Sequence, residues 1–392
     1  MHSAARPDPL IYLIAGEQSG DVLGARLLEA LRAARPGLRF AGVGGPRMVE
    51  HGLEPLFPMH DLAVMGLLEV LPRLRHLRRR LNQVAADVRT RRPDVLVTID
   101  SPGFTLRLLR LLTGAGIPRV HYVAPQVWAW REHRVREFPG LWERLLCLLP
   151  FEPEFFAGHG LPATFVGHPV LQSGADRGNA ARFFATHDLA ADAKVLVLMP
   201  GSRRNEVPRL LPVFGDTLAL LRGRIPGLVP VLPVASAVAA TVRRAAARWP
   251  VPPVIVTEVA EKHDAYAAAS AALTKSGTST LELALAGVPM AVTYRVNPIT
   301  AAIARRLIRV KHVAMVNLLA GREAVPELLQ QDCTPGRLAE TVERLLGDPA
   351  AALAQRVAFR EVMARLAAPA GTPSEAAARE VLAMLADVPP AS

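Results

Sequence analysis

Residues 10–21 read LIYLIAGEQSGD. The first part, from Leu10 to Ala15, is an uninterrupted apolar run, and a glycine-containing turn leads from it into a stretch whose apolar residues have helical spacing. A continuous apolar strand is typical of a parallel sheet that helices cover on both faces. The stretch therefore predicts an α/β fold, with the turn after its first strand at the edge where such sheets bind ligands.

Short apolar runs and helical stretches go on alternating along the chain. Further strands are expected at residues 39–43, 94–100, 119–124, 144–149, 164–167, 194–199, 229–232, 254–257, 271–274 and 290–293. A polar stretch from Gln172 to Ala193 divides them, so we predict two doubly wound, Rossmann-like domains, residues 1–172 and 173–348, that face a ligand cleft. The helices expected in residues 349–392 should pack back against these domains.

The composition limits the classes of function. The formal net charge is +11, and only four of the 46 basic residues are lysines, so arginines imply anionic partners. Cys147 and Cys333 are far apart and fit neither a disulfide framework nor a zinc site. The sequence has no D-x-D, H-E-x-x-H or Walker motif, so we expect no metal and no cofactor. It also has no signal-peptide pattern and no plausible membrane span, which predicts a cytoplasmic location.

The turn after the first strand is a candidate binding site. Gly16 and Gly20 allow backbone amides to approach a ligand, and the helix that follows favours a negative group there. The turn differs from the dinucleotide G-x-G-x-x-G pattern, which disfavours a redox function. Ser19 and Asp21 are candidate binding residues of the same turn, although both could simply cap the helix.

A candidate base ends the strand predicted at residues 94–100. The carboxylate of Asp100 should point from the carboxyl end of a buried parallel strand into the ligand site, where its surroundings can tune it as a general base. The alternative is a turn or helix-capping aspartate. Glu17, after the first strand, is the second candidate for a catalytic carboxylate.

The second half of the chain has two loops suited to phosphate. The strand that starts at Val195 runs into a glycine-serine turn at Gly201, where the guanidinium of Arg203 can bind a diphosphate. Arg204 beside it can equally be a solvated surface charge. A second, hydroxyl-rich turn is suited to a nucleotide sugar, and its candidate binding residues are Ser276, Gly277, Thr278, Thr280 and Glu282. Read alone, the second turn could be an ordinary capping box.

A basic amphipathic segment lies between the candidate loops. Apolar residues recur every three or four positions from Leu67 to Val88, and eight arginines fall between Leu71 and Arg92. Such a helix can lie on an anionic bilayer or receive an acidic lipid, although a core helix with a solvated arginine face fits the same pattern. The apolar run 62–68 before it could form a lip for acyl chains, although a buried strand explains the same residues. The second basic stretch, 283–322, has too few aromatic residues to favour nucleic acid.

Taken together, the motifs of this chain resemble the lipid-A-disaccharide synthase family over nearly the whole length. The resemblance rests on segments in the family's order, at residues 15–21, 45–48, 62–71, 93–100, 121–131, 149–152, 167–168, 200–207, 276–282 and 317–322. It implies an inverting, metal-independent glycosyltransferase of the B type. Its implied substrates are UDP-2,3-diacylglucosamine and 2,3-diacylglucosamine 1-phosphate, and its implied products are UDP and a β-1,6-linked tetraacyl disaccharide 1-phosphate.

The resemblance also implies roles for particular residues. Asp100 is the base on the acceptor 6-hydroxyl, and Arg203 binds the diphosphate. Asn317 and Arg322 close the donor side. The UDP moiety is bound by Ser276, Thr278, Thr280 and Glu282. The partners implied are the UDP-sugar donor, the acylated sugar-phosphate acceptor and the anionic cytoplasmic face of the inner membrane, with a homodimer as an open alternative and no nucleic acid.

The sequence departs from the family pattern at a few positions. The family usually continues Pro-Asp-Phe-Asn after the residue matching Asp100, whereas this chain has Gly103 and Thr105 in place of that Asp and Asn. Lys275 and Val316 stand where the family commonly has a small residue and a proline. Two alternative functions remain at this point. One is another UDP-sugar enzyme of the same fold, such as a lipid-linked N-acetylglucosaminyl transferase or a UDP-sugar 2-epimerase, and the other is a non-catalytic membrane-surface binder.

Overall fold

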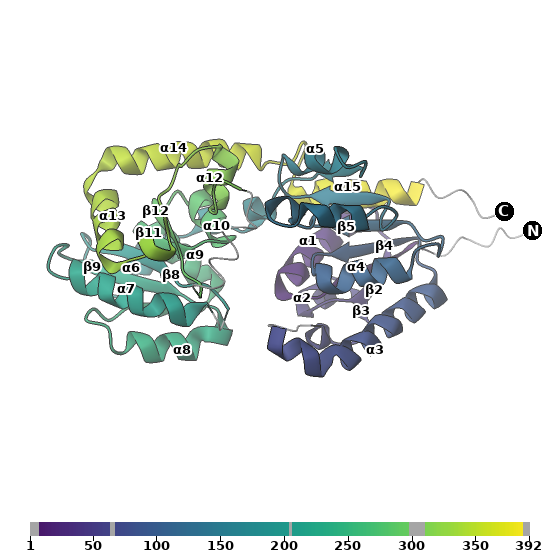
Figure 1. Ribbon diagram of the computed structural model, residues 1–392, viewed down its shortest axis with the longest axis horizontal. Helices are drawn as coiled ribbons and strands as arrows, with labels where there is room; N and C mark the ends of the chain where they lie inside the picture. Colours follow the sequence, from purple (N-terminus) through teal and green to yellow (C-terminus); the bar gives the residue numbers. More distant parts are fainter. Residues whose placement is uncertain (1–7, 63–66, 204–205, 298–309, 387–392) are drawn as a thin grey trace, which may run out of the picture. The chain divides into compact units, whose positions relative to one another are not determined.

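A computed structural model describes residues 8–62, 67–203, 206–297 and 310–386, with the backbone alone for residues 67–74 and 386 (Figure 1). The chain divides into two compact units. Unit 1 consists of Met1–Pro169 together with Leu366–Ser392, and unit 2 is Val170–Arg365. The last helix of the chain therefore belongs to the same unit as the first strand.

Unit 1 is built on a seven-stranded parallel sheet with the strand order β3-β2-β1-β4-β5-β6-β7. Its strands are β1 Leu10–Ala15, β2 Arg39–Val43, β3 Leu53–Pro55, β4 Val95–Ile99, β5 Arg119–Tyr122, β6 Arg144–Cys147 and β7 Ala163–Phe165. Its α-helices are α1 Gln18–Ala34, α2 Pro46–Glu50, α3 Leu67–Arg91, α4 Pro102–Leu111, α5 Glu152–Ala157 and α15 Pro373–Ala386. The β1–β4 pair at the centre places the loops after these two strands side by side.

Alternate residues of β1 point to opposite faces of this sheet, because side chains alternate along a strand. Tyr12 and Ile14 belong to the core that α3 and α4 cover, whereas Ile11 and Leu13 belong to the core that α1 and α15 cover. All four are fully buried. Burial on both faces explains why the strand is apolar without interruption.

Unit 2 is built on a six-stranded parallel sheet with the order β10-β9-β8-β11-β12-β13. Its strands are β8 Lys194–Met199, β9 Leu228–Pro233, β10 Val254–Val256, β11 Ala269–Lys275, β12 Met290–Tyr294 and β13 Glu327–Leu329. Its described α-helices are α6 Ala180–Thr186, α7 Val207–Leu221, α8 Ser236–Ala246, α9 Val259–Ala268, α10 Ser279–Leu285, α12 Met315–Ala320, α13 Pro335–Gly347 and α14 Pro349–Arg365. The two sheets confirm the predicted α/β class, and the edge strands β3 and β13 are additions to the prediction.

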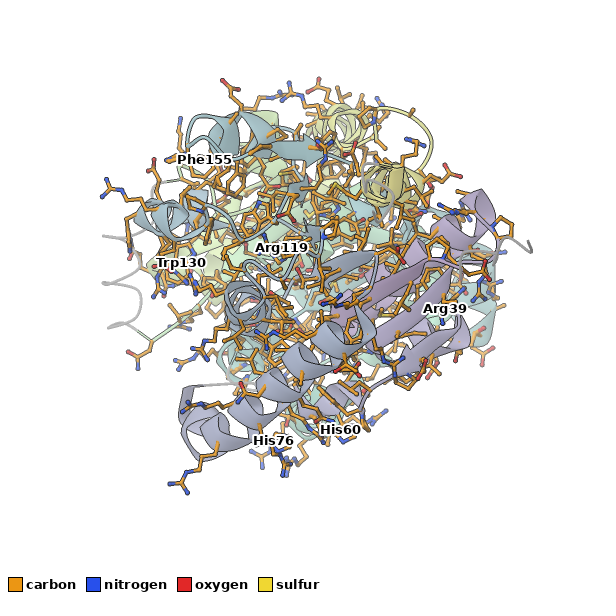
Figure 2. The ribbon with its side chains drawn as sticks, turned by 90° about the vertical axis from the view of Figure 1, so that its right-hand side faces the viewer. Arg39, His60, His76, Arg119, Trp130 and Phe155 are labelled. Carbon is orange, nitrogen blue, oxygen red and sulfur yellow. The ribbon has the colours of Figure 1, made fainter. Side chains whose placement is uncertain are left out.

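The basic amphipathic segment forms helix α3, and its two halves have different surroundings. Val84 and Val88 are fully buried against the sheet of unit 1, so this half is a core helix. Arg75, Arg78 and Arg79 on the preceding turns are exposed (Figure 2, where His76 marks this part of α3). Among the described residues, no helix is both long enough and apolar enough for a membrane span.

Some of the sequence predictions fall outside the described residues. These are residues 63–66 of the apolar run 62–68, Arg204, and residues 298–309 of the basic stretch 283–322. The corresponding predictions are therefore not tested by the structure.

Candidate functional site

The loops that follow β1 and β4 meet at one edge of the sheet in unit 1, because Ala15 is paired with Ile99 at the ends of these strands. Asp100 and Ser101 both have a positive φ, 49° and 48°, so the chain turns sharply from β4 into α4. A positive φ is uncommon for residues other than glycine and needs support from its surroundings. The Thr105 hydroxyl gives that support by donating to the carbonyl oxygens of Asp100 at 2.7 Å and Ser101 at 3.0 Å.

The Asp100 carboxyl has the electrostatic character expected of a base. Burial raises its pKa above the usual range, and a hydrogen bond from the Ser101 backbone N–H opposes this only in part. A raised pKa makes a carboxylate a better proton acceptor, provided that it remains ionised at the working pH. The backbone N–H of Asp100 donates to the Tyr122 carbonyl at 2.9 Å, which fixes the residue to the end of β5.

The turn after β1 brings its predicted residues to the same edge, but with different surroundings. Gly16 lies so close to Ser101 that an added Cβ would be 2.8 Å from the Ser101 hydroxyl oxygen. Gly20 is buried against Ala15, and a Cβ added at Gly20 would be 3.2 Å from the Ala15 Cβ. The absence of a side chain thus permits α1 to pack closely on β1. Glu17 and Ser19 are exposed.

Asp21 lies apart from this solvent-facing edge and caps another helix. Its carboxylate accepts from the backbone N–H groups of Arg47 at 3.2 Å and Met48 at 3.0 Å, in the first turn of α2. The residue is only 3% exposed. Both oxygens are therefore engaged with the protein, which favours the capping alternative for Asp21 over substrate contact.

A cavity of about 730 Å³ opens beside Glu17 and Ser101. Its walls come from α3, from α4 and from the turns after β1 and β4. The volume is within the range of sites that bind small molecules in proteins, about 300–1,000 Å³. The hydroxyl oxygen of Ser101 is buried and has no hydrogen-bond partner among the described residues, so the cavity wall contains an unsatisfied polar group.

In unit 2, the two predicted phosphate loops follow β8 and β11, which are neighbours in the sheet. Gly201 has a φ of 106°, which glycine adopts without strain. The Glu206 carboxylate lies between two cations, 3.2 Å from Arg203 Nη1 and 3.1 Å from Lys275 Nζ. The structure thus brings Lys275 to the same loop as Arg203, a role that the sequence analysis missed because it treated Lys275 only as a departure from the family.

In the hydroxyl-rich turn after β11, two of the hydroxyls predicted to bind UDP instead form hydrogen bonds within the protein. The Ser276 hydroxyl donates to the Val313 carbonyl at 2.9 Å, and the Thr280 hydroxyl donates to the Gly277 carbonyl at 2.7 Å. Gly277 and Thr278 are exposed at the turn. Two of the hydroxyls are therefore engaged within the protein. The groups that face solvent at this turn, and that a ligand could contact, are those of Gly277 and Thr278.

Glu282 is also engaged inside unit 2. It accepts from Lys262 Nζ at 2.9 Å and from the Tyr266 hydroxyl at 3.2 Å. A ligand hydroxyl that binds here would share the carboxylate with these two groups. Spacing along the sequence could not reveal Lys262 and Tyr266 as its partners, because both come from α9.

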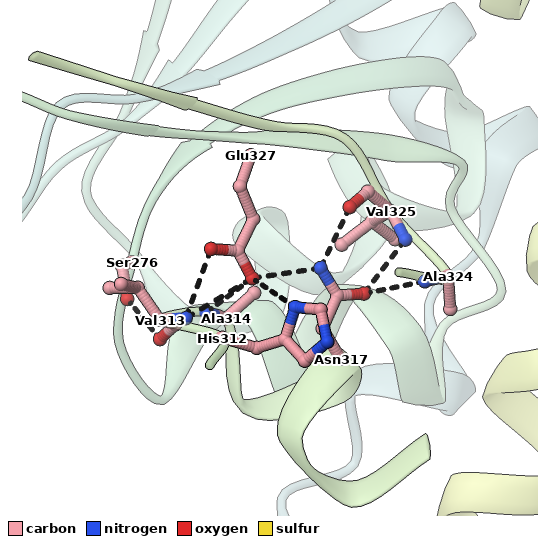
Figure 3. A network of polar contacts seen from close by, with 8 residues as sticks. All are labelled: Ser276, His312, Val313, Ala314, Asn317, Ala324, Val325 and Glu327. Carbon is pink, nitrogen blue, oxygen red and sulfur yellow. Dashed lines mark hydrogen bonds and ion pairs between the residues drawn. The ribbon is translucent and has the colours of Figure 1, made fainter. Parts of the chain in front are cut away.

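Asn317 lies in a closed network of polar contacts (Figure 3). Its side-chain NH₂ donates to the Val325 carbonyl and to Glu327, each at 2.8 Å, and its side-chain oxygen accepts from the backbone N–H groups of Ala324 and Val325 at 2.8 and 2.9 Å. Asn317 is fully buried. Arg322, by contrast, is exposed and paired with Glu361 at 2.7 Å.

Two further motif segments of unit 1 meet at Glu152, which the site prediction did not include. Its carboxylate accepts from Trp128 Nε1 at 3.1 Å and from the backbone N–H groups of Leu148 and Leu149 at 3.1 and 3.0 Å. Burial raises the pKa of Glu152 to about 7, although these hydrogen bonds oppose the shift. The signal in the sequence is an acid three residues after the strand predicted at residues 144–149, inside a motif segment of the family.

Comparison with known families and proteins gives consistent matches over nearly the full length. A family model described as lipid-A-disaccharide synthetase matches residues 11–381. The lipid-A-disaccharide synthase of Granulibacter bethesdensis is 63% identical over 388 residues, covering 96% of this chain and 99% of that protein. The one from Gluconobacter oxydans is 63% identical over 383 residues, covering 98% of this chain and 92% of that protein.

Solved structures with low sequence identity share the fold. The glycotransferase of kitacinnamycin has a TM-score of 0.63 at 20% identity, with 97% of this chain and 100% of that chain covered. UDP-GlcNAc 2-epimerase from Neisseria meningitidis, solved with UDP-GlcNAc, also has a TM-score of 0.63, at 12% identity and with 97% and 100% covered. At these identities the likeness concerns the fold, and it agrees with the predicted α/β class.

Proposed function

This chain belongs to the lipid-A-disaccharide synthase family, a glycosyltransferase family of lipid A biosynthesis, and we propose that Asp100 is the base of its reaction. The reaction that we assign joins UDP-2,3-diacylglucosamine to the 6-hydroxyl of 2,3-diacylglucosamine 1-phosphate. The observation that carries the assignment of the base is the Asp100 carboxyl, whose pKa is raised by burial at the carboxyl edge of the sheet, next to a cavity of about 730 Å³.

In the proposed step, the oxygen of the acceptor 6-hydroxyl attacks C1 of the donor sugar. The Asp100 carboxylate takes the proton of this hydroxyl as the attack proceeds. The new C1–O bond forms on the face opposite the UDP, and the bond from C1 to the diphosphate oxygen breaks, so the configuration inverts. The electron pair leaves with UDP. The strained turn at Asp100 and Ser101, braced by Thr105, holds the base in one orientation while this happens.

For the leaving group, we propose that Arg203 and Lys275 stabilise the charge that develops on UDP. Both cations already hold an anion, the Glu206 carboxylate, at 3.2 and 3.1 Å. A diphosphate carries more negative charge than one carboxylate and can compete for the same donors. The Gly277–Thr278 turn after the neighbouring strand would supply backbone amides to the same diphosphate.

Measuring UDP release by the purified protein tests the proposed function. With both lipid precursors present, we expect release of UDP in a 1:1 ratio with the disaccharide product. UDP-GlcNAc in place of the acylated donor should give neither transfer nor epimerisation. Binding of both lipids without UDP release would instead favour the non-catalytic alternative. A homodimer stays a prediction that the single chain in the structure does not test.

The donor site predicts a metal-independent reaction. Cationic side chains and the loop amides after β8 and β11 supply the donors that a divalent ion otherwise provides to a diphosphate. Excess chelator should therefore leave the initial rate of UDP release unchanged, with a magnesium-dependent glycosyltransferase as the positive control for chelation. A rate that falls and is restored by magnesium would contradict this account of the donor site.

We also propose that the exposed arginines of α3 hold the protein at an anionic membrane surface. Each arginine near such a surface contributes about 1 kcal/mol, and salt screens this attraction. Arg80 is not available for it, because it forms an ion pair with Asp61 and lies 4.4 Å from the Phe57 ring centroid. The test should therefore reverse Arg75, Arg78 and Arg79, which are exposed.

The expected result is loss of the salt-sensitive part of binding in vesicle co-sedimentation when these three arginines are changed to Glu. Changing Arg243, Arg244 and Arg248 of unit 2 to Glu alters the net charge equally and provides the control, since these arginines are also exposed. Equal losses in both triple variants would indicate attraction to net charge only. Unchanged sedimentation of the α3 variant would place the membrane contact elsewhere.

A further inference from the structure

The lining of the cavity in unit 1 combines polar and apolar side chains. Glu17 and Ser101 come from the turns after β1 and β4, at the edge of the sheet that carries Asp100. The apolar side chains of the lining are those of Leu62, Leu77, Leu81, Phe104 and Leu111, next to Pro102. Leu111 is 41% exposed, so the apolar lining continues to the protein surface. A ligand that matches this lining has a polar head and a hydrocarbon chain.

Arginines from two helices also line this cavity. Arg78 comes from α3 and Arg107 from α4, and both are exposed. Neither has an ion-pair or hydrogen-bond partner in the described part of the chain. Arg110, the third arginine of the lining, instead pairs with Glu137 at 2.9 Å. The cavity thus contains two uncommitted cations beside an apolar wall, and no carboxylate other than Glu17 is in its lining to neutralise them.

We propose that this cavity binds the acceptor, with its phosphate on Arg78 and Arg107 and an acyl chain against the leucines and Phe104. The proposal rests on the proposed function, because it names the site of that reaction's acceptor. Two guanidinium groups are suited to a phosphate, since each can donate two parallel hydrogen bonds to its oxygens. The sugar then lies toward Ser101, whose buried hydroxyl has no partner among the described residues and can bond a sugar hydroxyl.

Gly103 explains how this chain keeps room for the acyl chain. It lines the cavity as the second residue of α4, and no atom lies within 4 Å of the position where its Cβ would be. In the family pattern this position commonly carries an aspartate, which would place a charge in the apolar lining. The glycine leaves the space open and uncharged, and its φ lies outside the left-handed region, so a larger side chain fits the backbone.

The phosphate contact is tested by changing the arginines to methionine, which keeps the apolar stem. The KM for the acceptor is measured in neutral detergent micelles, with the phosphorylated acceptor and with the same lipid lacking its phosphate. We expect the double variant, with Arg78→Met and Arg107→Met, to have a KM for the phosphorylated acceptor that is roughly 10- to 100-fold higher, because charge-assisted hydrogen bonds are lost. The KM for the donor should stay unchanged. The KM for the acceptor without phosphate should be the same in the double variant and in the wild type.

Arg243→Met is the control, because Arg243 is exposed on a helix of unit 2 and does not line the cavity. We expect its KM to equal that of the wild type. An unchanged KM in the double variant, or equal increases in the double variant and in Arg243→Met, would overturn the phosphate site. Wild-type protein that binds the phosphorylated acceptor in calorimetry but releases no UDP would contradict the function while preserving the site.

The acyl contact is tested by filling the cavity with Gly103→Leu. Gly336 is the control position, since it is also the second residue of a helix and also has no atom within 4 Å of a Cβ. We expect Gly103→Leu to lower kcat/KM for the long-chain acceptor at least about tenfold and to spare an acceptor with short acyl chains, whereas Gly336→Leu changes neither. Both variants should melt no lower than the wild type, because leucine is the better helix former. Unchanged kinetics in a folded Gly103→Leu variant would refute the acyl site.

Discussion

Replacement of Asp100 by asparagine is expected to lower kcat by about 10² to 10⁴, the usual contribution of a positioned general base. Asparagine keeps the shape of the side chain but cannot accept the proton. The KM for the UDP-sugar should stay within about twofold, because the donor loops belong to unit 2. Steady-state UDP release with the donor and the acceptor varied in turn gives both constants.

The same substitution should not destabilise the fold, which separates a catalytic role from a structural one. Burial raises the pKa of Asp100, so its ionised form is disfavoured in the folded state. The stability that this group contributes is present below its unfolded-state pKa, about 3.9, and is lost as the pH rises through the raised folded-state value. At neutral pH the asparagine variant should therefore melt at the same temperature as the wild type or higher.

The pH dependence of the wild type has a definite sign. A base must be deprotonated to act, so kcat/KM for the acceptor, which reports the free enzyme, should fall as the pH is lowered through the pKa of Asp100. Because burial raises this pKa, the fall should occur at a higher pH than for an ordinary aspartate. Near-native turnover of Asp100→Asn would contradict the assignment and transfer the role to Glu17. Glu17→Gln is the companion variant, and we expect it to have the smaller effect because Glu17 is exposed.

The fold could be predicted from the sequence because each long strand is buried on both faces. β1, β2 and β8 match the expected ranges residue for residue, since apolar runs and their glycine or proline boundaries determine them locally. β3 and β13 were missed. Like β7 and β10, which were predicted, each is a three-residue edge strand, Leu53–Pro55 and Glu327–Leu329. The missed strands each contain a glutamate and no β-branched residue, whereas β10 is Val-Ile-Val and β7 contains a threonine, so only the missed pair lacks a strand pattern of its own.

The candidate site could be predicted only in part. Strand-end positions such as Asp100 follow from topology, because the carboxyl ends of parallel strands share one edge. Motif residues such as Asp21 and Asn317 instead turn inward, and only the fold shows that backbone groups already occupy their hydrogen-bonding atoms. Lys275 presents the reverse case, because its contact with Glu206 depends on the pairing of β8 with β11.

The departure at Thr105 shows why a motif mismatch can be uninformative before the fold is known. The family asparagine is replaced, but the threonine hydroxyl donates to the carbonyls of Asp100 and Ser101 and braces the turn that carries the base. A side chain at this position thus needs a hydrogen-bond donor that can reach the carbonyl oxygens of the preceding turn. Threonine meets this requirement with its single hydroxyl.

Replacement of Asn317 by alanine is expected to lower the stability of unit 2 strongly, by about 3–5 kcal/mol. The change leaves the N–H groups of Ala324 and Val325, the Val325 carbonyl and Glu327 without one partner each, and a buried group left unsatisfied costs about 1–3 kcal/mol. For a unit of this size the melting temperature should fall by roughly 10 °C. Calorimetry or thermal circular dichroism measures the shift.

Arg322→Met is the matched control from the same motif, since its exposed ion pair with Glu361 should contribute at most about 1 kcal/mol. The network also reaches the donor turn, because Glu327 accepts from the Val313 N–H at 3.0 Å while the Val313 carbonyl accepts from the Ser276 hydroxyl at 2.9 Å (Figure 3). Well below its melting temperature, Asn317→Ala should therefore raise the KM for the donor only a few-fold and keep kcat. A variant that melts like the wild type but no longer binds the donor would show instead that Asn317 contacts the UDP-sugar directly, as the family resemblance implies.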